Sequence, residues 1–436
     1  TASHNPPEYN GYKVYWQDGA QFTPPHDTGV AECVAAVKKL SDVKTIDLKK
    51  AVEKGLYEEI GKAVDDAYIN NVKAQVLSSE AIKKEGDKIK IVYTPLHGTG
   101  NIPVRRVLDE LGFKNVYVVK EQELPDSEFS TVSYPNPEDE AVFELALKLA
   151  KKEDADLMLA TDPDADRLGV YVKDTKSGEY KVLTGNMSGS LLCEYILARR
   201  KEQGLIPENA EVVKSIVTTK LADAVAKNYG CRLVEVLTGF KWIGRHILEN
   251  EENKKGSYMF GFEESYGCLI GTYARDKDAI SASAALCEAA AYYKTKGKSL
   301  WDVMLDMYEH YGYYKDCVES LSLSGIEGRK KIDGIMQDFR ENVPDEMGSA
   351  KVNFVRDYKK GIITNRLTKD TMSSNLPKSD VVYYDCEDGT WVCARPSGTE
   401  PKIKFYFGVK AGTYEDMLER AEKLKKDIEL KISNIK

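Results

Sequence analysis

The sequence predicts an α/β fold for most of the chain, with a smaller α+β domain at the C-terminal end. From about residue 89, apolar strands alternate with helical segments, which is the pattern of parallel strand–helix–strand units. The same alternation recurs from about residue 210. From about residue 380 it gives way to short neighbouring strands of antiparallel type and one closing helix.

The first part of the chain, over 31–79, is expected to be mostly helical. Apolar residues recur there at helical spacing, for example at Val34, Val37 and Leu40. Two α/β stretches follow. The expected elements of the first are a strand and loop at 89–100, a helix at 104–111, a strand at 114–119, a helix at 138–152 and a strand at 155–160. The expected elements of the second are a helix at 186–204, a strand at 210–219, a helix at 220–230, a strand at 231–237, a strand and loop at 257–267 and a helix at 278–297.

The last segment has a different pattern. Short strands are expected in "DVVYYDC", "TWVCARP" and "KIKFYFGV", before a helix that Thr413 and Asp416 can cap. One face of that helix carries Met417, Leu418, Ala421, Leu424 and Ile428. We therefore expect four domains, at 1–84, 85–185, 186–315 and 316–436.

Composition narrows the class of protein. The 436 residues are 42% hydrophobic and 30% charged, which is typical of a globular protein with buried cores. A formal net charge of −8 argues against a general nucleic-acid binder. No apolar run is long enough for a transmembrane helix, and no signal peptide is recognisable. The eight cysteines are scattered without a C-x-x-C pair, which favours free thiols in a reducing cytoplasm and argues against zinc.

The loop "TDPDADR" is the first candidate site. Asp162, Asp164 and Asp166 alternate directly after an apolar strand, so their carboxylates can converge on one hard cation. An EF-hand is excluded, because the sixth position would be Arg167 instead of glycine. A set of only three protein ligands is suited to Mg²⁺, because its other coordination positions can hold water or a phosphate oxygen. A solvated acidic turn is the alternative.

Three further loops carry polar side chains. In "CARPSGTEPKIKFYF", a guanidinium, two hydroxyls and a glycine backbone can cradle a phosphate, although a plain turn is the alternative. In "GFEESYG", Glu263 and Ser265 can face the same way and bind sugar hydroxyls, or form a surface turn. In "TASHNPPEYNGYK", Ser3 needs a base or a metal to become a nucleophile, and could equally cap a helix.

Together these loops resemble the α-D-phosphohexomutase superfamily, most closely its phosphoglucomutases of the glucose/pentose subgroup. The motifs "TASHNP", "DPDADR", "GFEESYG" and "RPSGTEP" match in the family's order over nearly the whole chain. The resemblance implies three related mixed-sheet α/β domains and a C-terminal α+β domain around a central cleft. It also leads us to expect that the N-terminal part of domain one, which precedes the serine loop in the family, is missing from this sequence.

The resemblance also implies roles for single residues. Ser3 matches the serine that carries the transferable phosphate, and Lys13 matches the general base or acid. His4 and Arg167 match residues beside the reacting phosphate. The implied Mg²⁺ ligands are Ser3, Asp162, Asp164 and Asp166. The implied substrate-binding residues are Gly239 and Lys241 in "TGFKWIG", Glu263 and Ser265, Lys277 in "RDKDA", and Arg395, Ser397, Gly398 and Thr399 for the phosphate that does not react.

The implied activity is that of an intramolecular phosphotransferase, a phosphoglucomutase of glucose metabolism. Glucose 1-phosphate would become glucose 6-phosphate through a phosphoserine enzyme and glucose 1,6-bisphosphate. The expected partners are small sugar phosphates, without nucleic acid or membrane, for a cytoplasmic monomer or weak dimer. The alternatives are a phosphopentomutase or phosphomannomutase of the same superfamily, and a sugar-phosphate binding protein without activity.

Overall fold

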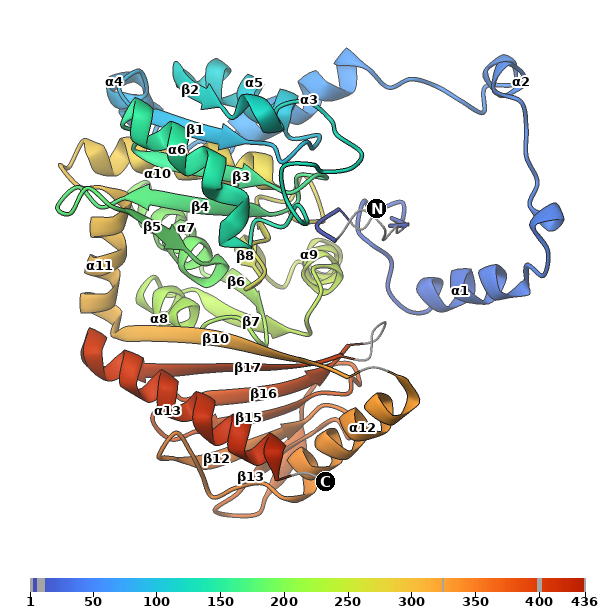
Figure 1. Ribbon diagram of the computed structural model, residues 1–436, viewed down its shortest axis with the longest axis vertical. Coiled ribbons are helices and arrows are strands. Elements are labelled where there is room, and N and C mark those ends of the chain that lie inside the picture. The colour runs from blue at the N-terminus through green and yellow to red at the C-terminus, as the bar shows by residue number, and fades with distance from the viewer. Residues whose placement is uncertain (1–2, 6–11, 324, 398–401, 435–436) are drawn as a thin grey trace.

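The structure is a computed structural model that describes residues 3–5, 12–323, 325–397 and 402–434. Its first part is helical, as the sequence predicts. The elements are α1 (His26–Ala36), η1 (Leu40–Asp42), α2 (Leu48–Glu53), α3 (Lys62–Lys73) and α4 (Ser79–Glu85). The segment that carries α1 and α2 loops away from the rest of the molecule, as Figure 1 shows, and its apolar Val34 and Leu40 are exposed.

A mixed five-stranded sheet follows, in the order β2-β1-β3-β4-β5. Its three first strands are parallel, and β4 and β5 join antiparallel. The strands are β1 (Lys90–Thr94), β2 (Asn115–Val118), β3 (Leu157–Thr161), β4 (Leu168–Lys173) and β5 (Tyr180–Leu183). The accompanying helices are α5 (Asn101–Leu111), η2 (Lys120–Gln122), η3 (Glu140–Phe143) and α6 (Glu144–Glu153). Alternate residues of β1 face different cores, since Ile91 packs with α5 and Val92 with α6.

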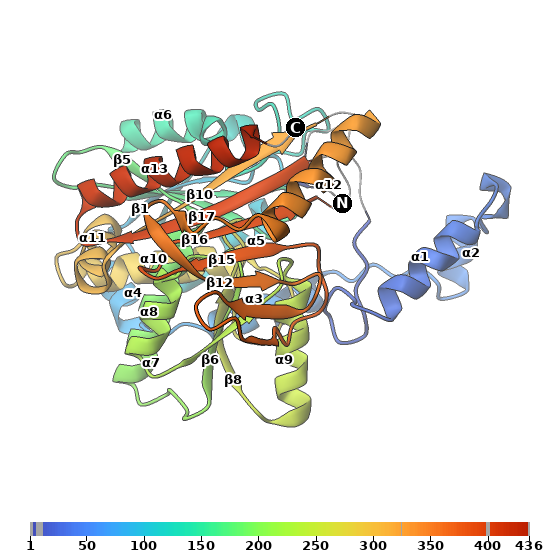
Figure 2. The ribbon, with the colours of Figure 1, turned by 90° about the horizontal axis from the view of Figure 1, so that it is seen from below.

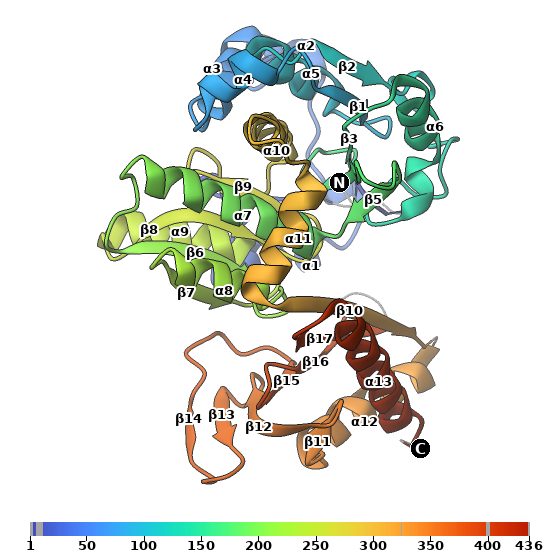
Figure 3. The ribbon, with the colours of Figure 1, turned by 90° about the vertical axis from the view of Figure 1, so that its left-hand side faces the viewer.

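A second mixed sheet has the order β7-β6-β8-β9. Its strands are β6 (Ala210–Ser215), β7 (Arg232–Val236), β8 (Ser257–Phe262) and β9 (Cys268–Ile270), of which β9 alone runs antiparallel to its neighbour. The helices are α7 (Gly185–Glu202), α8 (Leu221–Asn228), α9 (Lys241–Asn253), α10 (Ala279–Lys294) and α11 (Leu300–Tyr311). In the side view, α10 lies between the two mixed sheets (Figure 3), and it packs against α4 and α5 as well as β9.

The C-terminal sheet is antiparallel throughout, in the order β10-β17-β16-β15-β12-β13-β14, with β11 beside β12. Its elements are β10 (Tyr313–Ser322), α12 (Gly325–Glu341), β11 (Glu346–Met347), β12 (Ala350–Asp357), β13 (Ile362–Asn365), β14 (Thr371–Ser373), β15 (Val382–Cys386), β16 (Trp391–Pro396), β17 (Lys402–Ala411) and α13 (Tyr414–Ser433). Figure 2 shows α12 and α13 packed against this sheet. The hydroxyl of Thr413 accepts the N–H of Asp416, so the predicted cap of α13 is confirmed.

The predicted fold class is confirmed, with two mixed α/β sheets and a separate antiparallel sheet. Before β1, the described residues form helices and one isolated β-bridge, between Tyr15 and Gln21. Four of the five residues predicted to share the inner face of α13 are buried, whereas Leu418 is 38% exposed at its edge. No helix in the described part of the chain has the length and apolarity that a membrane crossing needs.

Candidate active site

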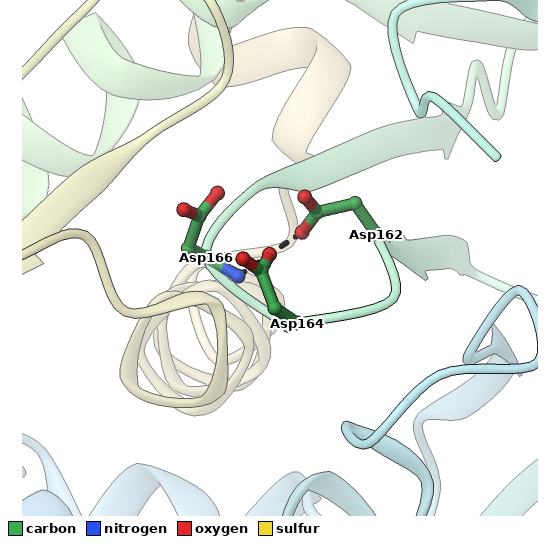
Figure 4. Close-up of side chains that lie close together, drawn as sticks. All are labelled: Asp162, Asp164 and Asp166. Carbon is green, nitrogen blue, oxygen red and sulfur yellow. Dashed lines mark hydrogen bonds between the residues drawn. The ribbon is translucent and has the colours of Figure 1, made fainter. Parts of the chain in front are cut away.

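The three-aspartate loop connects β3 to β4 and brings its carboxylates close together (Figure 4). One ligand oxygen from each of Asp162, Asp164 and Asp166 lies within 4.8 Å of the others. Two backbone N–H groups, of Asp166 at 3.0 Å and Arg167 at 2.9 Å, donate to Oδ1 of Asp162. Ala165 closes the turn in the left-handed region, at φ 57°. The loop is therefore tightened around Asp162, which is fully buried.

Ser3 and Lys13 lie directly against this loop, although they are far from it in sequence. The Oγ atom of Ser3 is 2.8 Å from Oδ2 of Asp162 and 2.6 Å from Oδ1 of Asp164. The Nζ atom of Lys13 is 2.5 Å from Oδ2 of Asp164 and 2.9 Å from Oδ2 of Asp166. The structure thus brings together the hydroxyl, the ammonium and the carboxylates that the sequence singled out separately.

The crowded charges shift the pKa of each group. Burial, together with the neighbouring carboxylates of Asp166 and Asp164, holds the pKa of Asp162 well above its usual range. Burial works against ionisation of Asp164 as well, but the bonds from Lys13 and Ser3 outweigh it and lower the pKa of Asp164. Burial also opposes the charge on Lys13, yet Asp166 and Asp164 raise the pKa of Lys13. Lys13 is therefore an ammonium at neutral pH in this arrangement.

Two buried atoms beside the carboxylates lack a hydrogen-bond partner among the described residues. They are Oδ1 of Asp166 and Nε of Arg167, which make only a long ion pair with each other, at 3.8 Å. A buried polar atom without a partner is costly, so such atoms indicate a place for a bound group. A free carboxylate oxygen suits a hard cation, and a free guanidinium N–H suits a phosphate oxygen. The residues of this loop therefore fit a Mg²⁺ ion next to a phosphate.

Arg167 and His4 complete this end of the site. A second guanidinium nitrogen of Arg167, Nη1, donates to Oε1 of Glu138 at 2.5 Å, which fixes the direction of the side chain. Burial and the charge of Arg167 lower the pKa of His4 to about 4. His4 is therefore neutral at pH 7, and can donate or accept a hydrogen bond without adding charge.

The predicted sugar-binding loops meet at the ends of β7 and β8. The backbone N–H of Gly239 donates to Oε1 of Glu263 at 2.7 Å, and Glu263 is 5% exposed. Ser265 is half-buried in the turn before β9. Lys241, at the start of α9, pairs with Asp27 of the N-terminal segment at 3.6 Å.

Lys277 links these loops to the aspartate loop. Its Nζ atom is 3.2 Å from Oδ2 of Asp166 and 2.8 Å from Oδ1 of Asp276, and its side chain is 10% exposed. Lys277 also lies over the ring of Phe240, at 5.5 Å from the ring centroid. In this structure Lys277 thus contacts one of the three aspartates, Asp166.

The predicted phosphate cradle belongs to the C-terminal sheet. Arg395 lies on β16, and the N–H of Ser397 donates to the carbonyl of Lys402 at 2.7 Å. Gly398 and Thr399 lie outside the described residues. The cradle is therefore carried by a different sheet from the aspartate and sugar loops.

Sequence reasoning missed two carboxylates that hold site residues. Glu138 binds Arg167, and Asp276 binds Lys277. Glu138 lies in a long irregular segment without a motif, so no local pattern singled it out. Asp276 stands next to Lys277 within "RDKDA", and that adjacency of opposite charges was an available signal.

Comparisons with known proteins agree with this architecture. Four phosphoglucomutase/phosphomannomutase domain families match: alpha/beta/alpha domain I at residues 1–41, domain II at 66–178, domain III at 184–311 and the C-terminal domain at 343–426. A phosphoglucomutase of Staphylococcus aureus (strain MSSA476) is 37% identical over 423 residues, which cover 96% of this chain and 73% of that protein. The phosphoglucomutase of strain N315 is 36% identical over the same length.

Solved structures share the fold at lower identity. A phosphoglucomutase/phosphomannomutase family protein of Burkholderia thailandensis gives a TM-score of 0.62 at 17% identity, covering 100% of this chain and 76% of that one. Parafusin of Paramecium gives a TM-score of 0.59 at 18% identity, covering 85% of this chain and 62% of that one. N-acetylphosphoglucosamine mutase of Aspergillus fumigatus, solved with GlcNAc-6P and magnesium, gives 0.56 at 14%, covering 99% and 88%. With its four domain families and a relative matched along nearly its whole length, the chain belongs to the phosphoglucomutase/phosphomannomutase family of α-D-phosphohexomutases.

Proposed function

We propose that the protein is a phosphoglucomutase that interconverts glucose 1-phosphate and glucose 6-phosphate, with Ser3 as the phosphate carrier. One observation carries the proposal. The Ser3 hydroxyl lies 2.8 and 2.6 Å from two members of a three-carboxylate cluster, and Lys13 binds the same cluster. The name of the S. aureus relatives supports glucose as the sugar.

The metal is proposed to be Mg²⁺, held by Asp162, Asp164 and Asp166 with the phosphate of Ser3. The unpartnered Oδ1 of Asp166 and the mutual repulsion of the carboxylates support this, as does the magnesium of the A. fumigatus mutase. When bound, Mg²⁺ supplies neutralisation of the charge on the transferred phosphoryl group. The protein's own residues then have to position that group and handle one proton.

Lys13, Arg167 and His4 are proposed to act on the reacting phosphate. The P–O bond at Ser3 breaks as a bond forms from a hydroxyl of glucose 1-phosphate, and the proton of that hydroxyl must leave. Lys13, which is an ammonium in this arrangement, would give its proton to the departing Oγ of Ser3 and take up the proton of the attacking hydroxyl, so that the protons balance. The Nε of Arg167, which makes no hydrogen bond here, would donate to a phosphoryl oxygen, and neutral His4 would add a hydrogen bond.

The remaining predicted residues are proposed to hold the substrate. Glu263 and Ser265 would bind sugar hydroxyls, and Gly239 and Lys241 would read the sugar's orientation. The second phosphate would be held by Arg395, Ser397, Gly398 and Thr399, and by Lys277 once its side chain leaves Asp166, which it contacts in this structure. Glucose 1,6-bisphosphate, the proposed intermediate, would turn in the cleft and return its other phosphate to Ser3, so a cradle that accepts either phosphate is required.

The test is a mutase assay of the full-length protein with Mg²⁺ and catalytic glucose 1,6-bisphosphate. Glucose, mannose and ribose 1-phosphates are compared by kcat/KM. We expect glucose 1-phosphate to be preferred, because a site that hydrogen-bonds a hydroxyl discriminates strongly against its loss or inversion. Equal or higher kcat/KM for mannose or ribose 1-phosphate would contradict the proposed substrate. If the protein bound sugar phosphates but converted none of them, the proposed enzymatic activity would be contradicted.

A further inference from the structure

A small hairpin directly follows the serine loop and is anchored to the second mixed sheet through one carboxylate. Within residues 13–22, Tyr15 and Gln21 form an isolated antiparallel bridge. The hydroxyl of Tyr15 and the side-chain amide of Gln21 both donate to Oδ2 of Asp276, each at 2.9 Å. One oxygen of Asp276 thus holds both strands of the hairpin at the same level.

The other oxygen of Asp276 is tied to the reacting end of the site. Oδ1 accepts the backbone N–H of Lys277 at 2.9 Å and its Nζ at 2.8 Å. Lys277 Nζ lies 3.2 Å from Oδ2 of Asp166, the same oxygen that Lys13 Nζ approaches at 2.9 Å. The contacts therefore close a ring that runs from Lys13 through Asp166, Lys277 and Asp276 to Tyr15, two residues from where it began.

Beyond the hairpin, α9 also contacts this part of the chain, because Arg245 Nη1 donates to Thr23 Oγ1 at 3.0 Å and Lys241 lies 3.6 Å from Asp27. Residues 26–60 are almost all exposed, and Figures 1 and 2 show α1 and α2 away from the body of the molecule. The hairpin itself has two weaker anchors. The first is Ala20, which is 4% exposed and packs so closely on Gly244 that a Cβ added to this glycine would lie 3.3 Å from the Cβ of Ala20. The second is Asp18, which lies 3.7 Å from Arg275.

We propose that Asp276 is a positioning residue that fixes Lys13 against the three-aspartate cluster. The inference rests on the proposed function, because Lys13 is the group that it would hold for phosphoryl transfer. Its physical basis is that the Asp276 side chain is only 15% exposed and receives hydrogen bonds from a tyrosine, a glutamine and a lysine. Charge-assisted bonds of this kind fix geometry better than neutral ones.

The test compares Asp276→Asn with the matched control Asp18→Asn in the full-length protein. Asparagine at 276 removes the negative charge that pairs with the Lys277 ammonium. Its N–H₂ group would also face either Lys277 or the donors of Tyr15 and Gln21, and cannot accept their hydrogen bonds. Asparagine at 18 loses only the 3.7 Å contact and can still accept the N–H of Ala20. We expect Asp276→Asn to lower kcat about 10- to 100-fold, with KM for glucose 1-phosphate nearly unchanged, because a small misplacement of reacting groups is costly. Asp18→Asn should stay close to wild type.

Hydrogen exchange gives a second measurement that does not depend on activity. The N–H groups of Trp16 and Gly19 are bonded within the hairpin, at 2.8 and 2.9 Å. Asp276→Asn should speed their exchange, and Asp18→Asn much less, whether or not the protein is a mutase. Unchanged exchange in Asp276→Asn would overturn the anchor. Faster exchange with kcat within twofold of the control would overturn the positioning role.

Tyr15→Phe keeps the proposal testable should Asp276→Asn fold poorly. It removes one donor from Oδ2 of Asp276 and leaves the carboxylate in place. It should lower kcat less than Asp276→Asn, and in the double variant it should add little, because both changes break the same contact. Independent, multiplying losses would contradict a shared role. Wild-type protein without mutase activity would contradict the proposed function, while the exchange result would still decide the anchor.

Discussion

At the scale of single residues, the site is organised by an excess of carboxylate over cation. Asp162, Asp164 and Asp166 share a space in which Lys13 and Lys277 supply the two nearest ammonium groups. Asp164 is the carboxylate that both Ser3 and Lys13 reach. Its charge should therefore matter for holding the serine, the lysine and a cation together.

Replacing Asp164 by asparagine should lower kcat by about 100-fold or more and raise the Mg²⁺ concentration needed for half-maximal rate, since one of three charged ligands is removed. Steady-state rates measured over a Mg²⁺ titration give both values. Asp333→Asn, an exposed change on α12, is the matched control and should leave both values unchanged. Wild-type activity of Asp164→Asn in excess chelator would show that the cluster holds no metal that catalysis needs.

At the scale of elements, the packing of the second mixed sheet depends on a close approach between helix α7 and strand β8. Gly189 lies in the second turn of α7, and a Cβ there would overlap the ring of Phe262, which is fully buried on β8. Phe262 immediately precedes Glu263, so this contact also supports the proposed sugar loop.

Gly189→Ala should therefore destabilise the protein by about 1–3 kcal/mol, the usual cost of overpacking a core. Gly334→Ala on α12 is the control, because nothing lies within 4 Å of its Cβ position. That change should be neutral or stabilise by up to about 1 kcal/mol, since alanine is the better helix former. Thermal unfolding midpoints of the two variants test the difference, and equal midpoints would contradict the packing of α7 on β8.

A second contact between elements predicts a pH dependence of stability. Glu288 on α10 is 2% exposed and accepts the backbone N–H groups of Leu77 and Ser78, which precede α4. Burial raises the pKa of Glu288 from 4.5 to about 7. Between these values the folded state keeps a proton that the unfolded state has lost, so the free energy of unfolding falls as pH rises.

The fall attributable to Glu288 should reach about 3 kcal/mol between pH 4.5 and 7. Glu288→Gln cannot ionise, so its unfolding midpoint should change less with pH over this range than that of wild type. Glu327→Gln, an exposed change with 86% of the side chain accessible, should follow wild type. The same pH dependence in Glu288→Gln and wild type would contradict a buried, protonated carboxyl.

The elements that the sequence predicted are those with a strong local pattern. Examples are the helix α7, which has a long run of buried residues, and the strand β3, whose five residues are all buried. The helices α9, α11 and α12 were not predicted, and neither was the hairpin of β4 and β5, although its strands pair with each other and with the neighbouring β3. The strand β10 was not predicted because its partner β17 lies far along the chain, where local periodicity does not identify it. Asp276 was missed for a related reason, since its partners Tyr15 and Gln21 are 261 and 255 residues away.

At the scale of the whole molecule, the site exists only because distant segments meet. Ser3 and Asp162 are 159 residues apart in sequence and 2.8 Å apart in space. The motifs therefore predicted the chemistry of each loop, while their meeting followed only from the family resemblance and is seen in the fold. The bounds of the four domains, near residues 84, 185 and 315, stay a prediction that limited proteolysis can test.

Transfer of a phosphate to Ser3 is the most direct measurement of the central claim. Full-length protein, first stripped of phosphate, is incubated with glucose 1,6-bisphosphate and Mg²⁺, and then chased with glucose 1-phosphate. Intact mass and peptide mapping should show one phosphoryl group on Ser3 after the first step, and glucose 6-phosphate should form as mutase turnover begins. Ser3→Ala should neither take up the phosphoryl group nor turn over substrate. Ordinary mutase activity in Ser3→Ala, or a phosphoryl group on another residue, would contradict the account.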